Sequence, residues 1–302
     1  MSAPQTEMIH ARAHGLDLLP AEDALAILAS GQAEAAAAVQ QAVPAIAAAA
    51  ELAAAQYRQG GRLIYAAAGS SGLMALADAL ELPGTYGLDL GRVKVLLAGG
   101  MAMLTQLQGG PEDDTEAARA DMLRAGVTAA DCVVALSASG TTPYAIAALE
   151  AARAAGARTV AISNNGDVPL FASADVAIYL PTPPEVIAGS TRMGAGTAQK
   201  IALNMLSTTM AMLLGHVHDG FMVNVIADNL KLQQRARGMV MAVSGVAEAE
   251  AGAALDAAAG DVKLAVLVAA GAHVEQARQL LVEHEGHLRP SLAAVRGPLT
   301  IV

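Results

Sequence analysis

Two short turns rich in glycine and hydroxyl side chains are the residues of this sequence best suited to chemistry. They are Gly69-Ser-Ser-Gly72 and Ser137-Ala-Ser-Gly-Thr-Thr-Pro143. Where such a turn joins a strand to a helix, its N–H groups and hydroxyls surround an anion at the positive end of the helix dipole. One turn alone is also compatible with an ordinary serine N-cap, but two at one sheet edge can converge on a single phosphate. The spacing is not Gly-x-Gly-x-x-Gly, so a dinucleotide site is not indicated.

Short apolar runs alternate with helical patterns around these turns. The runs are apolar on both faces, as strands are in a parallel sheet covered by helices, and they span residues 62–68, 93–98, 131–137, 158–163 and 175–180. Helical patterns occupy residues 71–82, 115–125 and 142–155. This alternation predicts an α/β fold with a doubly wound, five-stranded parallel sheet. Both turns then follow the carboxyl ends of strands, where such sheets bind ligands.

Helices are expected on either side of the sheet region. The stretch 21–59 is rich in Ala, Leu and Glu, and Pro44 is expected to begin a second helix within it. Further helices are expected at 193–215 and 224–243, and a weak repeat over 248–271 and 274–295 predicts two small helical units. We therefore expect an N-terminal helical region (1–58), a sheet domain (59–240) and a C-terminal helical module (241–302) that resembles ubiquitin-associated modules.

The composition argues against several classes of partner. The formal net charge is −10, whereas nucleic acids and anionic membranes need a basic surface. Gln40, Gln41, Pro44 and Glu51 interrupt the apolar N-terminal stretch, which lacks the run of about 18 apolar residues of a spanning helix. The N-terminus shows no secretory signal pattern, and the single cysteine, Cys132, lies in an apolar run and is expected to be buried and unreactive. These features predict a cytoplasmic protein without nucleic-acid or membrane partners.

The two turns on a five-stranded sheet resemble the sugar isomerase (SIS) domain of sugar-phosphate isomerases and sugar-phosphate-responsive regulators. One branch of that superfamily is much more similar. Residues 189–208, Gly-Ser-Thr-Arg-Met-Gly-Ala-Gly-Thr-Ala-Gln-Lys-Ile-Ala-Leu-Asn-Met-Leu-Ser-Thr, are very similar to the signature of the N-acetylmuramic acid 6-phosphate etherases. Shorter similar segments extend the resemblance over nearly the whole chain; they are residues 15–20, 78–83, 85–87, 112–114, 184–187 and 229–232.

The resemblance implies cleavage of the lactyl ether of N-acetylmuramic acid 6-phosphate to N-acetylglucosamine 6-phosphate and lactate, by elimination and water addition. The two acid/base glutamates of the family map onto Glu81 and Glu112. No metal or cofactor is expected, because the C1 aldehyde of the open-chain sugar acidifies the C2 proton and the C3 ether oxygen lies β to it. We expect Glu81, at a helix end between Leu80 and Leu82, to be the acid with a raised pKa, and the less confined Glu112 to be the base. Judged from spacing alone, both would be solvated surface acids.

The remaining candidate residues would bind the substrate. Phosphate and sugar contacts are expected from Ser70, Ser71, Ser137, Ser139, Thr141, Thr142, Glu185, Ser190, Thr191 and Lys231. For Glu185, Ser190 and Thr191 the structural alternative is capping of the helix from residue 193, and for Lys231 it is a solvated helix lysine. His216 and His218 lack a third ligand at metal-binding spacing, so we expect no metal site.

The chain departs from the family pattern at two positions. Leu73 stands where the etherases usually carry Arg, and Gly194 where they usually carry Lys. Both departures concern recognition of the lactyl carboxylate, so an etherase paralogue that acts on another 3-substituted or 2-amino sugar phosphate stays open. Two other functions also stay open, an aldose–ketose isomerase of the same superfamily and a sugar-phosphate-sensing regulator without turnover, although the presence of both Glu81 and Glu112 favours the etherase. SIS enzymes are commonly dimers, and the apolar helices at the N-terminus and from residue 193 exceed what five strands need, so we expect a homodimer.

Overall fold

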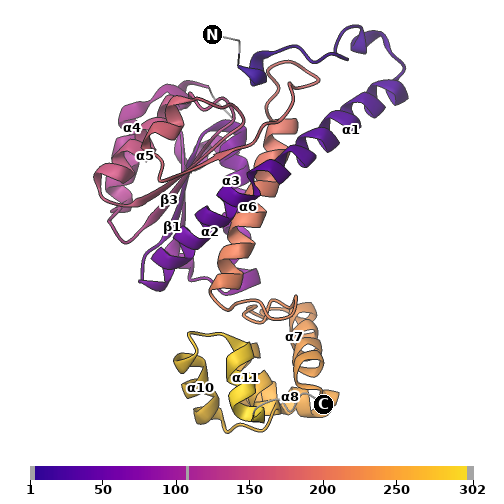
Figure 1. Cartoon of the computed structure of the whole chain (residues 1–302), viewed down its shortest axis with the longest axis vertical. Coiled ribbons are helices and arrows are strands. Elements are labelled where there is room, and N and C mark those ends of the chain that lie inside the picture. Colours follow the sequence, from indigo (N-terminus) through magenta and orange to yellow (C-terminus); the bar gives the residue numbers. More distant parts are fainter. Residues whose placement is uncertain (1–3, 107–108, 298–302) are drawn as a thin grey trace. The chain divides into compact units, whose positions relative to one another are not determined.

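The computed structural model describes residues 4–106 and 109–297 of the chain. The chain forms two compact units that alternate along the sequence (Figure 1). One contains the residues up to Ala79 together with Gly91–Thr209, and the other contains Leu80–Leu90 together with the residues from Met210 onward. The three-part division expected from the sequence, at 58/59 and 240/241, stays a prediction.

The first unit is built on a five-stranded sheet. Its strands are β1 (Leu63–Ala67), β2 (Val93–Leu97), β3 (Cys132–Ser137), β4 (Arg158–Ser163) and β5 (Val176–Tyr179), all parallel, in the order β2-β1-β3-β4-β5. Each predicted strand is confirmed, with its ends within about one residue of the expected ones. Because β1 lies between β2 and β3, the chain order reverses beside it, which is where doubly wound sheets bind ligands.

Helices cover both faces of this sheet. The helices of the first unit are α1 (Ala21–Ala38), α2 (Val43–Arg58), α3 (Gly69–Tyr86), α4 (Thr115–Ala125), α5 (Pro143–Ala154) and α6 (Gly194–Leu213), of which α3 and α6 continue into the second unit. In Figure 1, α4 and α5 lie on one face, and α2, α3 and α6 lie on the other. Ile64, Ala66 and Val133 pack into one buried cluster with α4 and α5, so the central strands are buried on both sides.

The apolar N-terminal stretch contributes a core helix. By length and composition alone, the helical stretch Ala21–Arg58 could cross a membrane, whereas the interrupted apolar pattern predicted no spanning helix. Its second half, α2, begins at Val43 with Pro44 in its first turn, as predicted. Seven residues of α2 are buried, among them Ile46, Ala50 and Ala54, and α2 packs on β3, β4 and β5. The apolar character of α2 is therefore explained by the core of the first unit.

Two helix boundaries differ from the prediction. The third helix was expected to stop before Pro83, but α3 runs through this proline to Tyr86 and closes with a hydrogen bond from Gly87 N to the Pro83 carbonyl at 2.9 Å. The later helix was expected to begin near Asn224, but α7 (Leu230–Ser244) begins six residues further on. In the second unit the intervening segment instead binds the end of α3, because Asn224 Nδ2 donates to the Tyr86 carbonyl at 2.8 Å.

The rest of the second unit is helical, as expected. Its helices are α7, α8 (Glu248–Ala257), α9 (Val262–Ala269), α10 (Val274–Glu283) and α11 (Leu288–Arg296). The two small units predicted from the repeat correspond to the pairs α8–α9 and α10–α11. Gly260 and Gly286 have positive φ in the turns between the paired helices, a conformation that glycine adopts without strain. Residues such as Val240, Leu264 and Val266 form a shared buried core.

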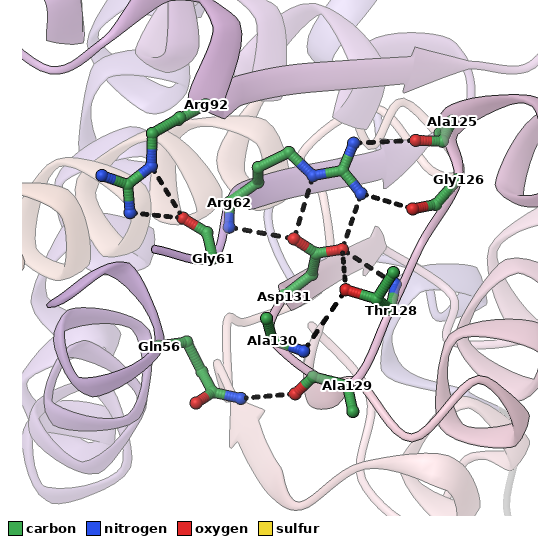
Figure 2. Close-up of polar contacts among 10 residues, drawn as sticks. All are labelled: Gln56, Gly61, Arg62, Arg92, Ala125, Gly126, Thr128, Ala129, Ala130 and Asp131. Atoms are coloured by element: carbon green, nitrogen blue, oxygen red, sulfur yellow. Dashed lines mark hydrogen bonds and ion pairs between the residues drawn. The ribbon is translucent and has the colours of Figure 1, made fainter. Parts of the chain in front are cut away.

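A polar cluster fixes the amino ends of β1 and β3 (Figure 2). Arg62 donates to the two carboxylate oxygens of Asp131 at 2.9 and 2.6 Å, and to the carbonyls of Ala125 and Gly126 at 2.8 and 2.7 Å. Asp131 also accepts from the backbone N–H groups of Arg62 and Thr128. Burial alone would raise the pKa of Asp131, but these hydrogen bonds outweigh it and leave the pKa below its usual range. The cluster joins the end of α4 to two central strands.

Candidate functional site

The two turns singled out from the sequence lie side by side at one edge of the sheet. Ala67, the last residue of β1, pairs with Leu136 of β3, so the turns that follow these strands are neighbours. The first turn is the beginning of α3, where Gly69 has a φ of +53° and Ser71 is buried. The second turn leads into α5, with Thr142 as N-cap and Pro143 in the first helical turn. Two helix N-termini therefore face the same end of the sheet.

The hydroxyls of the second turn form a connected cluster. Ser137 Oγ lies 2.7 Å from Thr142 Oγ1 and 3.2 Å from Ser139 Oγ, and it accepts from Gly140 N at 3.0 Å. Thr141 donates to Ser139 Oγ from both its N–H (3.2 Å) and its hydroxyl (2.9 Å). Ser137 is buried, whereas Ser139 and Thr142 are half-buried and Thr141 is exposed. The structure thus brings together all four hydroxyl residues predicted in this turn.

Gly140 allows the second turn to close. Its φ is +74°, and a Cβ there would lie 2.5 Å from Val168 Cγ2 and 2.6 Å from Ser163 Oγ. Any other residue would clash with the segment that follows β4 and would also be strained. The tight turn therefore depends on glycine for two independent reasons.

Glu112 lies against the first turn. A Cβ built on Gly69 would be only 2.6 Å from Glu112 Oε1, so the carboxyl group approaches the start of α3 where a side chain would otherwise stand. Burial, and after it the charge of Asp113, raises the pKa of Glu112. The expectation that Glu112 is the less confined of the two glutamates is wrong, because Glu112 is half-buried and Glu81 is exposed. The cause is the approach to Gly69, a contact between parts of the chain more than 40 residues apart.

Glu81 is held differently from the expectation. It was placed in the last turn of a helix among apolar neighbours, but α3 continues to Tyr86. Of the two flanking leucines, Leu82 is buried and Leu80 is 71% exposed. Glu81 belongs to the second unit, as does the other predicted site residue Lys231, which is exposed in the first turn of α7.

Glu185 caps the beginning of α6. It is buried, and its two carboxylate oxygens accept from the backbone N–H groups of Gly194 at 2.9 Å and Ala195 at 2.8 Å. This geometry corresponds to the structural alternative considered for Glu185. Ser190 and Thr191 lie half-buried in the turn before α6, where Met193 N donates to the Ser190 carbonyl and Gly196 N to the Thr191 carbonyl.

A buried asparagine that was not predicted from the sequence also contacts the second turn. Asn165, which follows β4, is buried and donates from Nδ2 to the Ser139 carbonyl at 3.1 Å. A signal was available, since Asn164-Asn165-Gly166 is a third polar turn directly after a predicted strand. Cys132, in contrast, is buried as predicted, and burial raises the pKa of its thiol to about 12.

Comparisons with known proteins agree with this architecture. A model of the SIS domain matches residues 100–209, and a model of the glucokinase regulatory protein N-terminal SIS domain matches residues 45–153. The N-acetylmuramic acid 6-phosphate etherase of Streptomyces avermitilis is 44% identical over 291 residues, covering 96% of this chain and 93% of the relative. That of Deinococcus radiodurans is 42% identical over 289 residues, covering 95% of each. The chain belongs to the N-acetylmuramic acid 6-phosphate etherase family.

The etherase family membership confirms the resemblance seen in the sequence, and solved structures confirm the fold. A phosphoheptose isomerase from Francisella tularensis is 16% identical, with a TM-score of 0.50 that covers 64% of this chain and 100% of the other. At this identity the likeness concerns the fold alone, which is the predicted SIS fold with added N- and C-terminal helices.

Proposed function

We propose that this chain cleaves the lactyl ether of N-acetylmuramic acid 6-phosphate, releasing N-acetylglucosamine 6-phosphate and lactate. It is then a carbon–oxygen lyase, the class to which its etherase relatives belong. The observation that carries the proposal is the carboxyl group of Glu112 against Gly69, in the turn after β1, beside the turn of clustered hydroxyls that follows the neighbouring strand β3. This arrangement supports the proposal, because a carboxyl group lies near clustered hydroxyls that could bind a phosphate.

The position of Glu112 also favours binding of the phosphate and of the sugar at different turns. Two turns at one edge could both hold the phosphate, but a carboxylate beside the first turn would repel a phosphate bound there. We therefore place the phosphate at the second turn, with Ser137, Ser139, Thr141 and Thr142 as ligands together with the N-terminus of α5. The sugar extends from there toward Ser70 and Ser71 at the first turn, with its reacting carbons near Glu112. Glu185, Ser190, Thr191 and Lys231 remain proposed sugar contacts.

The reaction needs one base and one acid. In the open-chain sugar, a carboxylate removes the C2 proton, and the electron pair left at C2 is delocalised into the C1 aldehyde. The C3–oxygen bond then breaks while a carboxylic acid gives its proton to the departing lactate oxygen. Water adds to C3 of the unsaturated aldehyde, and C2 regains a proton. Atoms and charges balance without a redox step.

We assign the base to Glu112 and the acid to Glu81. A raised pKa makes a carboxylate a stronger base, and general bases work best when their pKa lies nearer the operating pH. The half-buried Glu112 therefore suits the removal of a weakly acidic C–H proton better than an ordinary surface glutamate would.

The proposal is tested with N-acetylmuramic acid 6-phosphate and an assay for lactate. Glu81→Gln and Glu112→Gln should each reduce turnover about 10²–10⁴-fold, because each removes one proton transfer. In heavy water, Glu112→Gln should abolish exchange of the C2 proton, whereas Glu81→Gln should retain it. The reverse pattern would exchange the two roles, and near-normal lactate release by both variants would rule out the mechanism.

Leu73 and Gly194 leave two cations of the related etherases without a counterpart, so the lactyl carboxylate must be recognised by other groups. A Cβ on Gly194 would lie 3.1 Å from both Ala35 Cβ and Glu185 Oε2, so a longer side chain needs a shift there. The cytoplasmic location, the homodimer and the lack of nucleic-acid or membrane partners stay predictions from charge and sequence.

A further inference from the structure

The backbone of the second turn is held from behind by the segment that follows β4. Three consecutive carbonyls, those of Ala138, Ser139 and Gly140, accept hydrogen bonds from Asn164 N (3.1 Å), Asn165 Nδ2 (3.1 Å) and Leu170 N (3.2 Å) in turn. The C=O and N–H groups of one peptide point in opposite directions. Because these carbonyls bond to the segment after β4, the N–H groups of the same peptides point toward the hydroxyl side of the turn. Two of the three bonds come from the backbone. The middle bond comes from the Asn165 side chain, and the Ala138 carbonyl accepts a further, longer bond from Ser163 Oγ at 3.4 Å.

That side chain is in turn fixed by the N-terminal segment. Asn165 Nδ2 donates its second proton to Thr6 Oγ1 at 2.9 Å, and Asn165 Oδ1 accepts from Thr6 N at 3.3 Å. Thr6 lies in the short 3₁₀ turn Gln5–Glu7, 159 residues away in sequence. The terminal torsion of an asparagine has a broad energy profile, so the amide needs this pair of bonds to keep one proton aimed at Ser139.

Both residues are removed from water. Thr6 is 4% exposed and Asn165 is 5% exposed. Water therefore cannot readily replace a lost hydrogen bond, so the loss of either bond should shift the backbone of the second turn. A second tie of the same segment, from the Tyr179 hydroxyl to Gln5 Oε1 at 3.2 Å, is exposed and does not involve Asn165.

We infer that Asn165 is a positioning residue for phosphate binding, and that Thr6 connects the N-terminal segment to the phosphate site. The hydrogen-bonded chain Thr6–Asn165–Ser139 is called the relay below. The inference rests on the proposed function in that it takes the second turn as the phosphate site. It predicts that changes at Thr6 weaken the binding of phosphorylated sugars without affecting proton transfer.

The test compares variants of the full chain by calorimetry with N-acetylglucosamine 6-phosphate and with N-acetylglucosamine, and by lactate release from N-acetylmuramic acid 6-phosphate. Thr6→Val keeps the shape of the side chain but removes its hydroxyl. It should raise Kd for the phosphorylated sugar and KM about 3–10-fold, the loss expected of one buried hydrogen bond, and leave kcat within about twofold. Asn165→Leu removes the whole relay and should have a larger effect of about 10–100-fold.

Two controls make the relay specific. Thr6→Ser retains the hydroxyl and should behave as the unchanged chain does. Tyr179→Phe removes the hydrogen bond from the Tyr179 hydroxyl to Gln5 and should also leave Kd and KM unchanged. Ser139→Ala removes a proposed phosphate ligand directly, so its Kd shows the largest loss of affinity to be expected.

Each outcome decides the inference. A normal Kd in Thr6→Val would overturn the part assigned to the N-terminal segment, even if Asn165→Leu failed to fold. Equal losses in Thr6→Val and Tyr179→Phe, or equal losses for sugars with and without phosphate, would overturn the relay. If the unchanged chain binds N-acetylglucosamine 6-phosphate but releases no lactate, the proposed reaction fails, while the binding measurements still test the relay.

Discussion

Among single residues, Gly69 has the most direct influence on the proposed base. Its Cβ position lies 2.6 Å from Glu112 Oε1, and its φ of +53° is one that glycine adopts easily. Gly69→Ala should therefore displace the carboxyl group and strain the first turn. We expect kcat to fall about 10–100-fold, since a misplacement of about 1 Å can cost 10²-fold, while Kd for N-acetylglucosamine 6-phosphate changes little. Steady-state kinetics and calorimetry measure the two quantities.

Gly109→Ala is the matched control for this change. Gly109 lies close to Glu112 in sequence, has an ordinary φ of −73° and has open space where a Cβ would stand. The kcat of the Gly109→Ala variant should stay near normal. An equal loss in both variants would mean that the loop responds to any added methyl group, and would contradict the role given to Gly69.

The raised pKa of Glu112 predicts a pH dependence. As the base, Glu112 must be deprotonated, so kcat/KM should fall on acidification through a pKa above the usual value of about 4.3. Asp113 contributes to the shift, after burial, so Asp113→Asn should lower the pKa and move this acid limb to lower pH. Asp114→Asn removes a neighbouring charge that is not among those causes and should leave the limb in place. A shift of the alkaline limb instead would identify Glu112 as the acid.

For single residues, the sequence predicted the cluster of hydroxyls better than it predicted which side chains are buried and what they contact. The hydroxyls of the second turn are adjacent in sequence, so their grouping follows from local structure. The burial of Glu112 depends on Gly69, which only the folded chain brings near, and the junction of Thr6 with Asn165 joins residues 159 apart. Local sequence carries no signal for contacts of that range.

At the scale of elements, the cluster of Arg62 and Asp131 should contribute strongly to stability. The side chain of Asp131 is 2% exposed, and the guanidinium of Arg62 supplies two of its hydrogen bonds. Arg62→Ala would leave a buried carboxylate with only its remaining donors, and we expect the free energy of unfolding to fall by about 3 kcal/mol. Urea denaturation at pH 7 measures the loss. The two turns proposed to bind substrate follow the carboxyl ends of β1 and β3, at the opposite end of these strands, so kcat should be unchanged in the folded fraction.

The same cluster gives a prediction about acid. The pKa of Asp131 is lowered on folding, so its contribution is present above the unfolded pKa of about 3.9 and is lost as pH falls through the folded value. The stability difference between the unchanged chain and Arg62→Ala should therefore be constant from about pH 7 to 5 and shrink below about pH 4. A difference that persisted at low pH would mean that packing of the arginine, not the ion pair, carries the effect.

Elements with strong local patterns were predicted well, and those set by distant contacts were not. The five strands are short apolar runs between polar turns, so their limits are visible in the sequence. The end of α3 was missed because a proline ordinarily stops a helix, whereas here Ile226 N donates to the Gly84 carbonyl and Asn224 to the Tyr86 carbonyl. The same contacts occupy the residues that were expected to begin α7.

At the scale of the molecule, we expect a homodimer, and the structure changes the reason. The helix α6 was thought to be surplus, but Leu203 and Leu206 on it are fully buried. In the helix α1 only Ala35 and Ala38 are buried, and Leu25 is 63% exposed, so α1 is the surplus helix that we propose to be covered in the dimer. Leu25→Glu should therefore shift the mass measured by light scattering at micromolar concentration from dimer to monomer.

Leu123→Glu is the control for assembly. Leu123 on α4 is 83% exposed and lies on another part of the first unit, so this variant should stay dimeric. If the unchanged chain were a fully active monomer, the expectation of a homodimer would be wrong.

The alternation of the two units along the chain has a consequence for biosynthesis. Glu81 lies in Leu80–Leu90, whose unit is otherwise made of residues from Met210 onward. The contact of Tyr86 with Asn224 spans 138 residues, which a ribosome adds in roughly 7–28 s at about 5–20 residues per second. During that interval the nascent chain can form the sheet, the hydroxyl turn and the position of Glu112, but the segment carrying Glu81 has no partner. Under the proposed mechanism, a chain arrested after α6 should bind sugar phosphate without cleaving it, because Leu80–Leu90 still lacks its contacts with Asn224 and Ile226.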